Sequence, residues 1–95
     1  MKVRYTSRAF VDREQIFAYL HERSLTGARN VMARIKAAIM QLRDQPSSGY
    51  RTNDPDIQAK LVGRYPYKIF YHVRGDTVEI VHIRHSACSP WLDET

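Results

Sequence analysis

Residues 63–85 read GRYPYKIFYHVRGDTVEIVHIRH, and this stretch decides the fold. Two runs rich in aromatic and β-branched residues, 67–73 and 77–84, flank Arg74-Gly75-Asp76. Gly-Asp is typical of a tight turn because both residue types tolerate a positive φ. The stretch therefore predicts a β-hairpin.

The hairpin carries apolar side chains on both of its faces. A turn centred on Gly75 and Asp76 pairs residues on one face as follows: Val73 with Val78, Tyr71 with Ile80, and Ile69 with His82. The other face carries Lys68, Phe70, His72, Glu79, Val81 and Ile83. A sheet with one face in water would show a polar second face, so either the tail or a loop of this chain, or a partner, is expected to cover it.

Two helices are predicted before the hairpin. After a short strand over residues 2–5, Ser7 is the expected N-cap of a helix that runs to about Arg23. Its apolar stripe consists of Ala9, Phe10, Ile16, Phe17 and Leu20. The second helix, capped by Ser24 or Thr26, has the clearest period in the chain, with one apolar face formed by Ala28, Val31, Met32, Ile35, Ala38, Ile39 and Leu42.

The remaining segment predicts a loop and one more strand. Residues 50–56 read as a loop and 57–62 as a strand, and Pro66 favours a start of the next strand at about Tyr67. The predicted class is α+β, a single domain over residues 1–95 in the order β-α-α-β-β-β. It packs an antiparallel helical hairpin on a small antiparallel sheet.

Composition restricts the possible functions. Fifteen Lys and Arg against ten Asp and Glu give a net charge of +5, which suits an acidic partner. The lone cysteine, Cys88, and four dispersed histidines lack the spacing of a metal site, and no cofactor motif occurs. Neither a signal peptide nor a membrane-spanning run is evident, so a reduced, cytoplasmic setting without membrane contact is expected.

Polar residues gather at the open end of the predicted hairpin: Arg64, Tyr65, Lys68, His82, Arg84 and His85, with Lys60 on the neighbouring strand. Such a set could hold phosphates and exchange a proton through a histidine. The plainer interpretation makes His82 a hydrogen-bonded, half-buried side chain and His72 the cross-strand partner of Glu79. In the tail, Trp91 is expected to anchor the chain end onto the body.

Several of these motifs resemble the ParE branch of the RelE/ParE toxins of bacterial type II toxin-antitoxin systems. The resemblance covers nearly the whole chain and rests on Ala28-Arg29, on Gly63-Arg64-Tyr65, on the run 67–71, on the Gly75-Asp76 turn and on the run 78–80 with Arg84-His85. It implies two helices on a small antiparallel sheet, and a ParD-like antitoxin whose acidic C-terminal segment wraps the toxin. The target would be DNA gyrase, without sequence-specific DNA binding by the toxin alone.

The resemblance also implies candidate residues for contact with target or antitoxin: Arg64, Tyr65, Lys68, Phe70, Val81, Ile83, Arg84, His85 and Trp91. The RelE-like branch, which cleaves messenger RNA in the ribosome, is the alternative and would use Arg64, Lys68 and His85 as catalytic residues. Its second arginine would fall near Cys88, where a thiol cannot stabilise a developing phosphorane charge as a guanidinium does. We therefore expect a gyrase-directed toxin without enzymatic chemistry.

One departure separates this chain from ParE-like relatives. They often read Arg-His-x-x-Arg-Arg, where this chain has Arg84-His85 followed by Ser86-Ala87-Cys88-Ser89. An expected basic pair is thus replaced by Cys88-Ser89. A third possibility is therefore an inactive homologue that retains only antitoxin binding.

Overall fold

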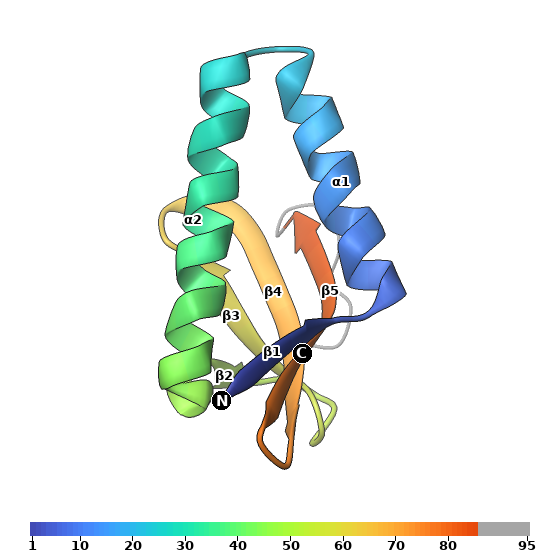
Figure 1. Ribbon diagram of the computed structural model, residues 1–95, viewed down its shortest axis with the longest axis vertical. Helices are drawn as coiled ribbons and strands as arrows, with labels where there is room; N and C mark the ends of the chain where they lie inside the picture. Colours follow the sequence, from blue (N-terminus) through green and yellow to red (C-terminus); the bar gives the residue numbers. More distant parts are fainter. Residues whose placement is uncertain (86–95) are drawn as a thin grey trace.

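A helical hairpin lies against one face of a five-stranded sheet in this computed structural model, which describes residues 1–85 (Figure 1). The helices are α1 (Ser7–His21) and α2 (Leu25–Asp44), followed by a short 3-10 turn, η1 (Pro46–Ser48). The strands are β1 (Lys2–Tyr5), β2 (Tyr50–Arg51), β3 (Gln58–Val62), β4 (Tyr65–Arg74) and β5 (Thr77–His85), in the spatial order β1-β5-β4-β3-β2. The predicted α+β class and element order are confirmed.

The antiparallel pairing predicted for the sheet is found for β2, β3, β4 and β5, but β1 makes the sheet mixed. β1 runs parallel to β5, with Val3 opposite Val78, whereas every other pair of neighbouring strands is antiparallel. Two helices and three strands separate β1 from its partner, so no tight turn forces the two strands to be antiparallel. The predicted loop over 50–56 also contains a strand, because Tyr50 and Arg51 pair with β3.

A bulge in the β4–β5 hairpin changes which side chains share a face. Tyr71 lies opposite Ile80 as predicted, but the register then shifts, so that Phe70 lies opposite His82 and Ile69 opposite Ile83. One extra residue in a strand turns every following side chain to the other face. The predicted pairing of Ile69 with His82 was therefore wrong, and Ile83 lies on the core face of the hairpin, where it is 2% exposed.

Backbone geometry corrects two local expectations and decides between two alternatives for a third. β4 begins at Tyr65 and contains Pro66, which is possible because the register between β3 and β4 also shifts there and Pro66 is not matched to a residue of β3. The N-cap of α1 is Thr6, whose hydroxyl accepts a hydrogen bond from the Ala9 N–H at 3.1 Å, and Ser7 is the first helical residue. Of the two proposed caps of α2, Ser24 is the one used.

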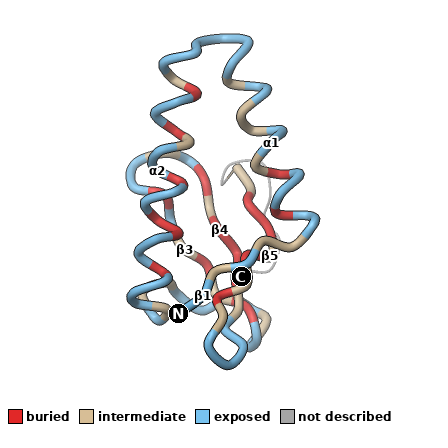
Figure 2. Tube along the Cα trace, viewed as in Figure 1, coloured by how far each residue is buried: buried red, intermediate tan, exposed pale blue. Residues whose placement is uncertain are grey.

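The core lies between the helices and the sheet (Figure 2). Its buried members are Ala9, Val31, Ile35, Ala38, Ile39, Leu42, Val62, Tyr67, Ile69, Tyr71, Val78, Ile80 and Ile83. The apolar face predicted for α2 is thus confirmed. In α1, Phe10 is 52% exposed, so its predicted place on the buried apolar stripe was wrong. A second, smaller cluster on the other face of the sheet joins Ile57, Ala59 and Phe70 with Val81.

Candidate functional site

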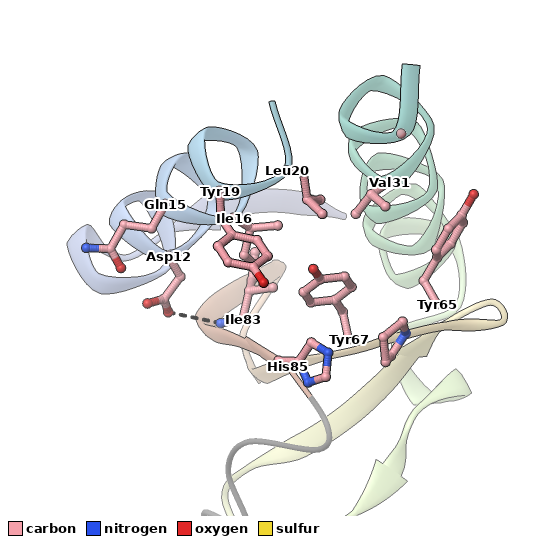
Figure 3. A pocket seen from close by; sticks show the side chains of 12 residues that line it. Asp12, Gln15, Ile16, Tyr19, Leu20, Val31, Tyr65, Tyr67, Ile83 and His85 are labelled. Atoms are coloured by element: carbon pink, nitrogen blue, oxygen red, sulfur yellow. Dashed lines mark hydrogen bonds between the residues drawn. The ribbon is translucent and has the colours of Figure 1, made fainter. Parts of the chain in front are cut away.

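An open apolar groove lies where the helical hairpin projects beyond the end of the sheet (Figures 1 and 3). Its volume is about 840 Å³. The residues that line it are Asp12, Gln15, Ile16, Tyr19 and Leu20 of α1, Gly27 and Val31 of α2, Tyr65, Pro66 and Tyr67 of β4, and Ile83 and His85 of β5.

Aromatic side chains surround this groove. Tyr67 is 6% exposed, and its ring meets His85 edge to face with the ring centroids 5.3 Å apart. Tyr19 is 55% exposed on α1, and the guanidinium of Arg23 lies 3.7 Å from the centroid of its ring. Figure 3 shows the side chains of Tyr19, Tyr65 and Tyr67 around the groove. Rings of this kind offer a large apolar contact area with a polar tip, which is typical of protein-binding surfaces.

One wall of the groove contains a buried ionic network. The Asp12 carboxylate accepts hydrogen bonds from the backbone N–H of Ile83 at 3.1 Å and from Arg8 Nε at 3.1 Å, and it contacts His82 Nδ1 directly. Asp12 is 7% and His82 6% exposed. β1 ends before this part of β5, so Asp12 replaces the missing strand by accepting the edge N–H of Ile83.

The hydrogen bonds of the network determine the protonation of His82. Arg84 Nη1 lies 2.7 Å from His82 Nε2, and because a guanidinium can only donate, Nε2 must be the acceptor. The ring is then neutral, with its proton on Nδ1 directed at Asp12. Burial agrees with this assignment, because loss of hydration lowers the pKa of His82 below its usual value of 6.5 despite the neighbouring Asp12 carboxylate. The expected hydrogen-bonded histidine is confirmed.

The structure divides the predicted polar cluster between two faces of the hairpin. Tyr65 and His85 line the groove on the helix side. Lys68 lies opposite Arg84, and Phe70 opposite His82, on the other face. Lys60 instead donates a hydrogen bond from Nζ to Ser48 Oγ at 3.2 Å.

Other predicted site residues fall away from the groove. Arg64 lies in the turn between β3 and β4, and Val81 packs with the second cluster. Trp91 and Cys88-Ser89 lie outside the described residues. In residues 1–85 no group of three or more His, Cys, Asp or Glu side chains could hold a metal ion, and no helix of this part is long and apolar enough to cross a membrane.

A second histidine–carboxylate pair lies near the hairpin turn. His72 Nε2 contacts the Glu79 carboxylate directly across the strands, as predicted, and Arg4 of β1 contacts the same carboxylate. The hydrogen bonds from His72 and then Arg4 hold the pKa of Glu79 at about 2, below its usual 4.5. This pair, together with Arg4, links β1, β4 and β5.

Asp12 is the residue of this region that sequence reasoning missed. It precedes His82 by 70 positions, and a lone carboxylate beside Arg13 in an amphipathic helix gives no sign of burial. The available signal was its spacing: Asp12 lies three residues after Ala9 and four before Ile16, which is the spacing of the apolar stripe. A charged residue on a buried stripe indicates a specific partner across the interface.

Comparisons with known proteins agree with this architecture. Residues 3–89 match the family described as ParE toxin of type II toxin-antitoxin system, parDE. A curated protein of Sinorhizobium fredii with the name "Putative toxin Y4kP" is 31% identical over 85 residues, which span 90% of this chain and 88% of that protein. A solved chain titled "Chromosomal ParDE TA system from P. aeruginosa" superposes with a TM-score of 0.77 at 19% identity, covering 90% of this chain and 95% of that one, and so shares the fold. The chain therefore belongs to the ParE toxin family of type II toxin-antitoxin systems.

Proposed function

We propose that this ParE-type toxin acts in the cytoplasm by binding and inhibiting DNA gyrase, and that a cognate antitoxin silences it by laying an apolar helix in the groove between α1, α2 and the β4–β5 hairpin. The groove is the observation that carries the proposal. It is long enough to contact both helices and two strands, and its lining is mostly apolar. Such grooves accept one face of an amphipathic helix through anchors spaced by three or four residues.

Charge supports an acidic partner in that groove. The chain carries +5, and in the described groove lining the one carboxylate, Asp12, is already engaged by Arg8, His82 and the Ile83 N–H. An acidic helix in the groove is therefore not repelled by an unpaired carboxylate of the lining. The surplus of Lys and Arg over the whole chain attracts such a helix from a distance.

Inhibition by binding rather than by catalysis is supported by where the alternative catalytic residues lie. Adjacent residues of a strand point to opposite faces, and Lys68 is opposite Arg84 whereas His85 is opposite Tyr67. Lys68 and His85 thus face opposite sides of the hairpin. A ribonuclease would need these groups to converge on one phosphate.

The antitoxin site is tested with a charge placed in the groove. Tyr19→Glu adds a carboxylate to the lining at a side chain that is already 55% exposed, so the fold should tolerate it. Phe10→Glu is the matched control, because Phe10 is 52% exposed on the same helix but does not line the groove. Binding of the cognate antitoxin should weaken about tenfold or more for Tyr19→Glu and little for Phe10→Glu. Equal losses would place the antitoxin elsewhere.

The target is tested by expressing the chain without antitoxin and following three readouts in one culture: viability, the DNA-damage response and messenger integrity. Growth arrest with DNA damage, together with inhibited supercoiling by purified gyrase, is the expected result. Arrest with cleaved messenger and normal supercoiling would replace the proposal by ribosome-dependent cleavage of messenger RNA. Absence of arrest would indicate an inactive homologue, and restoring arginines at Cys88 and Ser89 would then test whether the basic pair had carried the activity.

A further inference from the structure

A second hollow lies where the first turn of α1 meets β5, and it shares no lining residue with the groove. Its volume is about 370 Å³, and the described residues that line it are Thr6, Arg8, Val81, His82 and Arg84. Two guanidinium groups thus reach one small hollow from two different elements, one from a helix and one from a strand.

Both guanidinium groups are oriented by the buried Asp12–His82 pair. Arg8 donates from Nε to Asp12 Oδ1 at 3.1 Å, and Arg84 donates from Nη1 to His82 Nε2 at 2.7 Å. An arginine has five N–H donors in a rigid fork. Each of these contacts uses one nitrogen of a fork, so donors of both side chains remain for a ligand, and the forks are held in position before it arrives.

The acceptors at this hollow are already used. The Thr6 hydroxyl accepts from the Ala9 N–H and donates to the Val81 carbonyl at 3.1 Å. The Asp12 carboxylate receives Arg8, His82 and the Ile83 N–H. With His82 neutral, the two guanidinium charges exceed the single carboxylate charge by one. The hollow therefore offers donors and a net positive charge to a ligand.

We propose that Arg8 and Arg84 form a binding site for a phosphate group. A carboxylate has two oxygens in one plane, and a single guanidinium fork satisfies both of them. A phosphate directs its oxygens tetrahedrally, so it can bridge two forks that approach from different elements, and the hollow is large enough to admit it. The cross-strand neighbour of Arg84 is Lys68, which adds positive potential on the same face.

Two sources could supply this phosphate: a small ion or nucleotide, or the backbone of a nucleic acid. Backbone contact is independent of base sequence, because phosphates carry no sequence information. The site is therefore compatible with a toxin that does not recognise a DNA sequence. The inference does not depend on gyrase being the target or on the antitoxin lying in the groove.

The test uses the full purified chain at constant ionic strength, because phosphate binding depends steeply on salt. Inorganic phosphate and a mononucleotide are titrated while the Nε–H resonances of the arginines are followed by NMR. A fluorescent 20-mer of single-stranded DNA is titrated in parallel and followed by anisotropy. Arg8→Gln and Arg84→Gln remove the two forks. Arg29→Gln removes the same charge from an exposed position of α2 and is the matched control.

The expected result is a shift of the Arg8 and Arg84 resonances on addition of phosphate, with affinity reduced about tenfold in either variant and less than about twofold in Arg29→Gln. Arg84→Lys keeps the charge without the fork and should be intermediate, which separates recognition from any loss of folding. If Arg84 is needed for binding of inorganic phosphate and the mononucleotide but not of DNA, the ligand is a small molecule. If Arg84 is needed for DNA binding as well, the ligand is a nucleic-acid backbone.

Three outcomes would overturn the proposal. The first is phosphate affinity that is unchanged in Arg8→Gln and Arg84→Gln. The second is an equal loss in Arg29→Gln, because this would mean that diffuse charge and not the hollow attracts the anion. The third is displacement of Arg84-dependent binding by a glutamate-rich peptide but not by phosphate, which would make the hollow a site for an acidic protein.

Discussion

Residues 1–85 contain two histidine–carboxylate pairs, each with one member on β5, and the two pairs have different roles. His82 with Asp12 is buried, joins α1 to β5 and spans 70 residues. His72 with Glu79 spans seven residues within the hairpin, with the side chains 14% and 12% exposed. The first satisfies a strand edge that no neighbouring strand reaches, whereas the second adds to a ladder that already exists.

This difference shows that residue type alone does not determine how much an ion pair contributes to the stability of the fold. Glu79 gains less from Arg4, because that guanidinium is largely exposed and solvent competes for it. Removing one member of a buried pair is costly, because the remaining group stays buried without water and without its hydrogen-bond partner. The free energy of unfolding should therefore depend far more on Asp12 than on Glu79.

The largest expected effect is that of Asp12→Ala. It leaves His82 and the Ile83 N–H without their acceptor in a buried position, so the free energy of unfolding should fall by about 3 kcal/mol. Urea denaturation at pH 7 measures it, with Glu79→Ala as the matched removal of a carboxylate from the other pair. A loss in Glu79→Ala as large as that in Asp12→Ala would break the comparison.

A smaller effect is expected from acidification through the range in which His82 titrates. Because the pKa of His82 in the folded chain is lowered below 6.5, the unfolded chain binds the proton more readily. Stability should therefore be complete above pH 6.5 and be lost as the pH falls through the lowered pKa. Denaturation of wild type and His82→Gln at pH 8 and at successively lower pH isolates this contribution. His72→Gln, which retains His82, should keep the same pH-dependent loss.

The smallest expected effect concerns Glu79. Its pKa of about 2 lies below the usual 4.5, so the folded state releases this proton more readily, and the resulting stabilisation is present above pH 4.5 and lost between about pH 4.5 and 2. Glu79→Gln should lack that acid-dependent loss and should cost about 1 kcal/mol or less at pH 7, because Arg4 is largely exposed. An acid profile identical to that of the wild type would show that other carboxylates dominate this range.

The sequence predicted the pair whose geometry is local. The Gly75-Asp76 turn determines the register near it, so the pairing of His72 with Glu79 followed from counting residues. Beyond Tyr71 the same count failed, because Val81 is the extra residue of a bulge that no residue type signals. That single residue placed Ile83 on the core face of the hairpin and His82 on the opposite face beside Phe70, and so divided the predicted site.

The helices show the same limit. The apolar period of α2 predicted its buried face, because periodicity reports the side of a helix that faces the core. It could not report how far α1 and α2 project beyond the sheet, and that projection creates the groove. The parallel direction of β1 likewise depends on a partner more than 70 residues away. Local patterns thus predicted the elements, and tertiary geometry determined the site.

The parallel pairing of β1 with β5 also affects the order in which the chain can fold during synthesis. Residues 2–5 are made first, but their partners, residues 77–80, are among the last of the described part to appear. The helical hairpin contains only local contacts and can form in between, whereas closure of β1 onto the sheet must wait for β5. Because the hydrogen bond from the Thr6 N–H to Ile80 links the start of α1 to β5, both the groove and the phosphate hollow are completed only at that last step. A nascent chain that stops before β5 therefore has neither surface, and toxicity should appear only when translation has passed the hairpin.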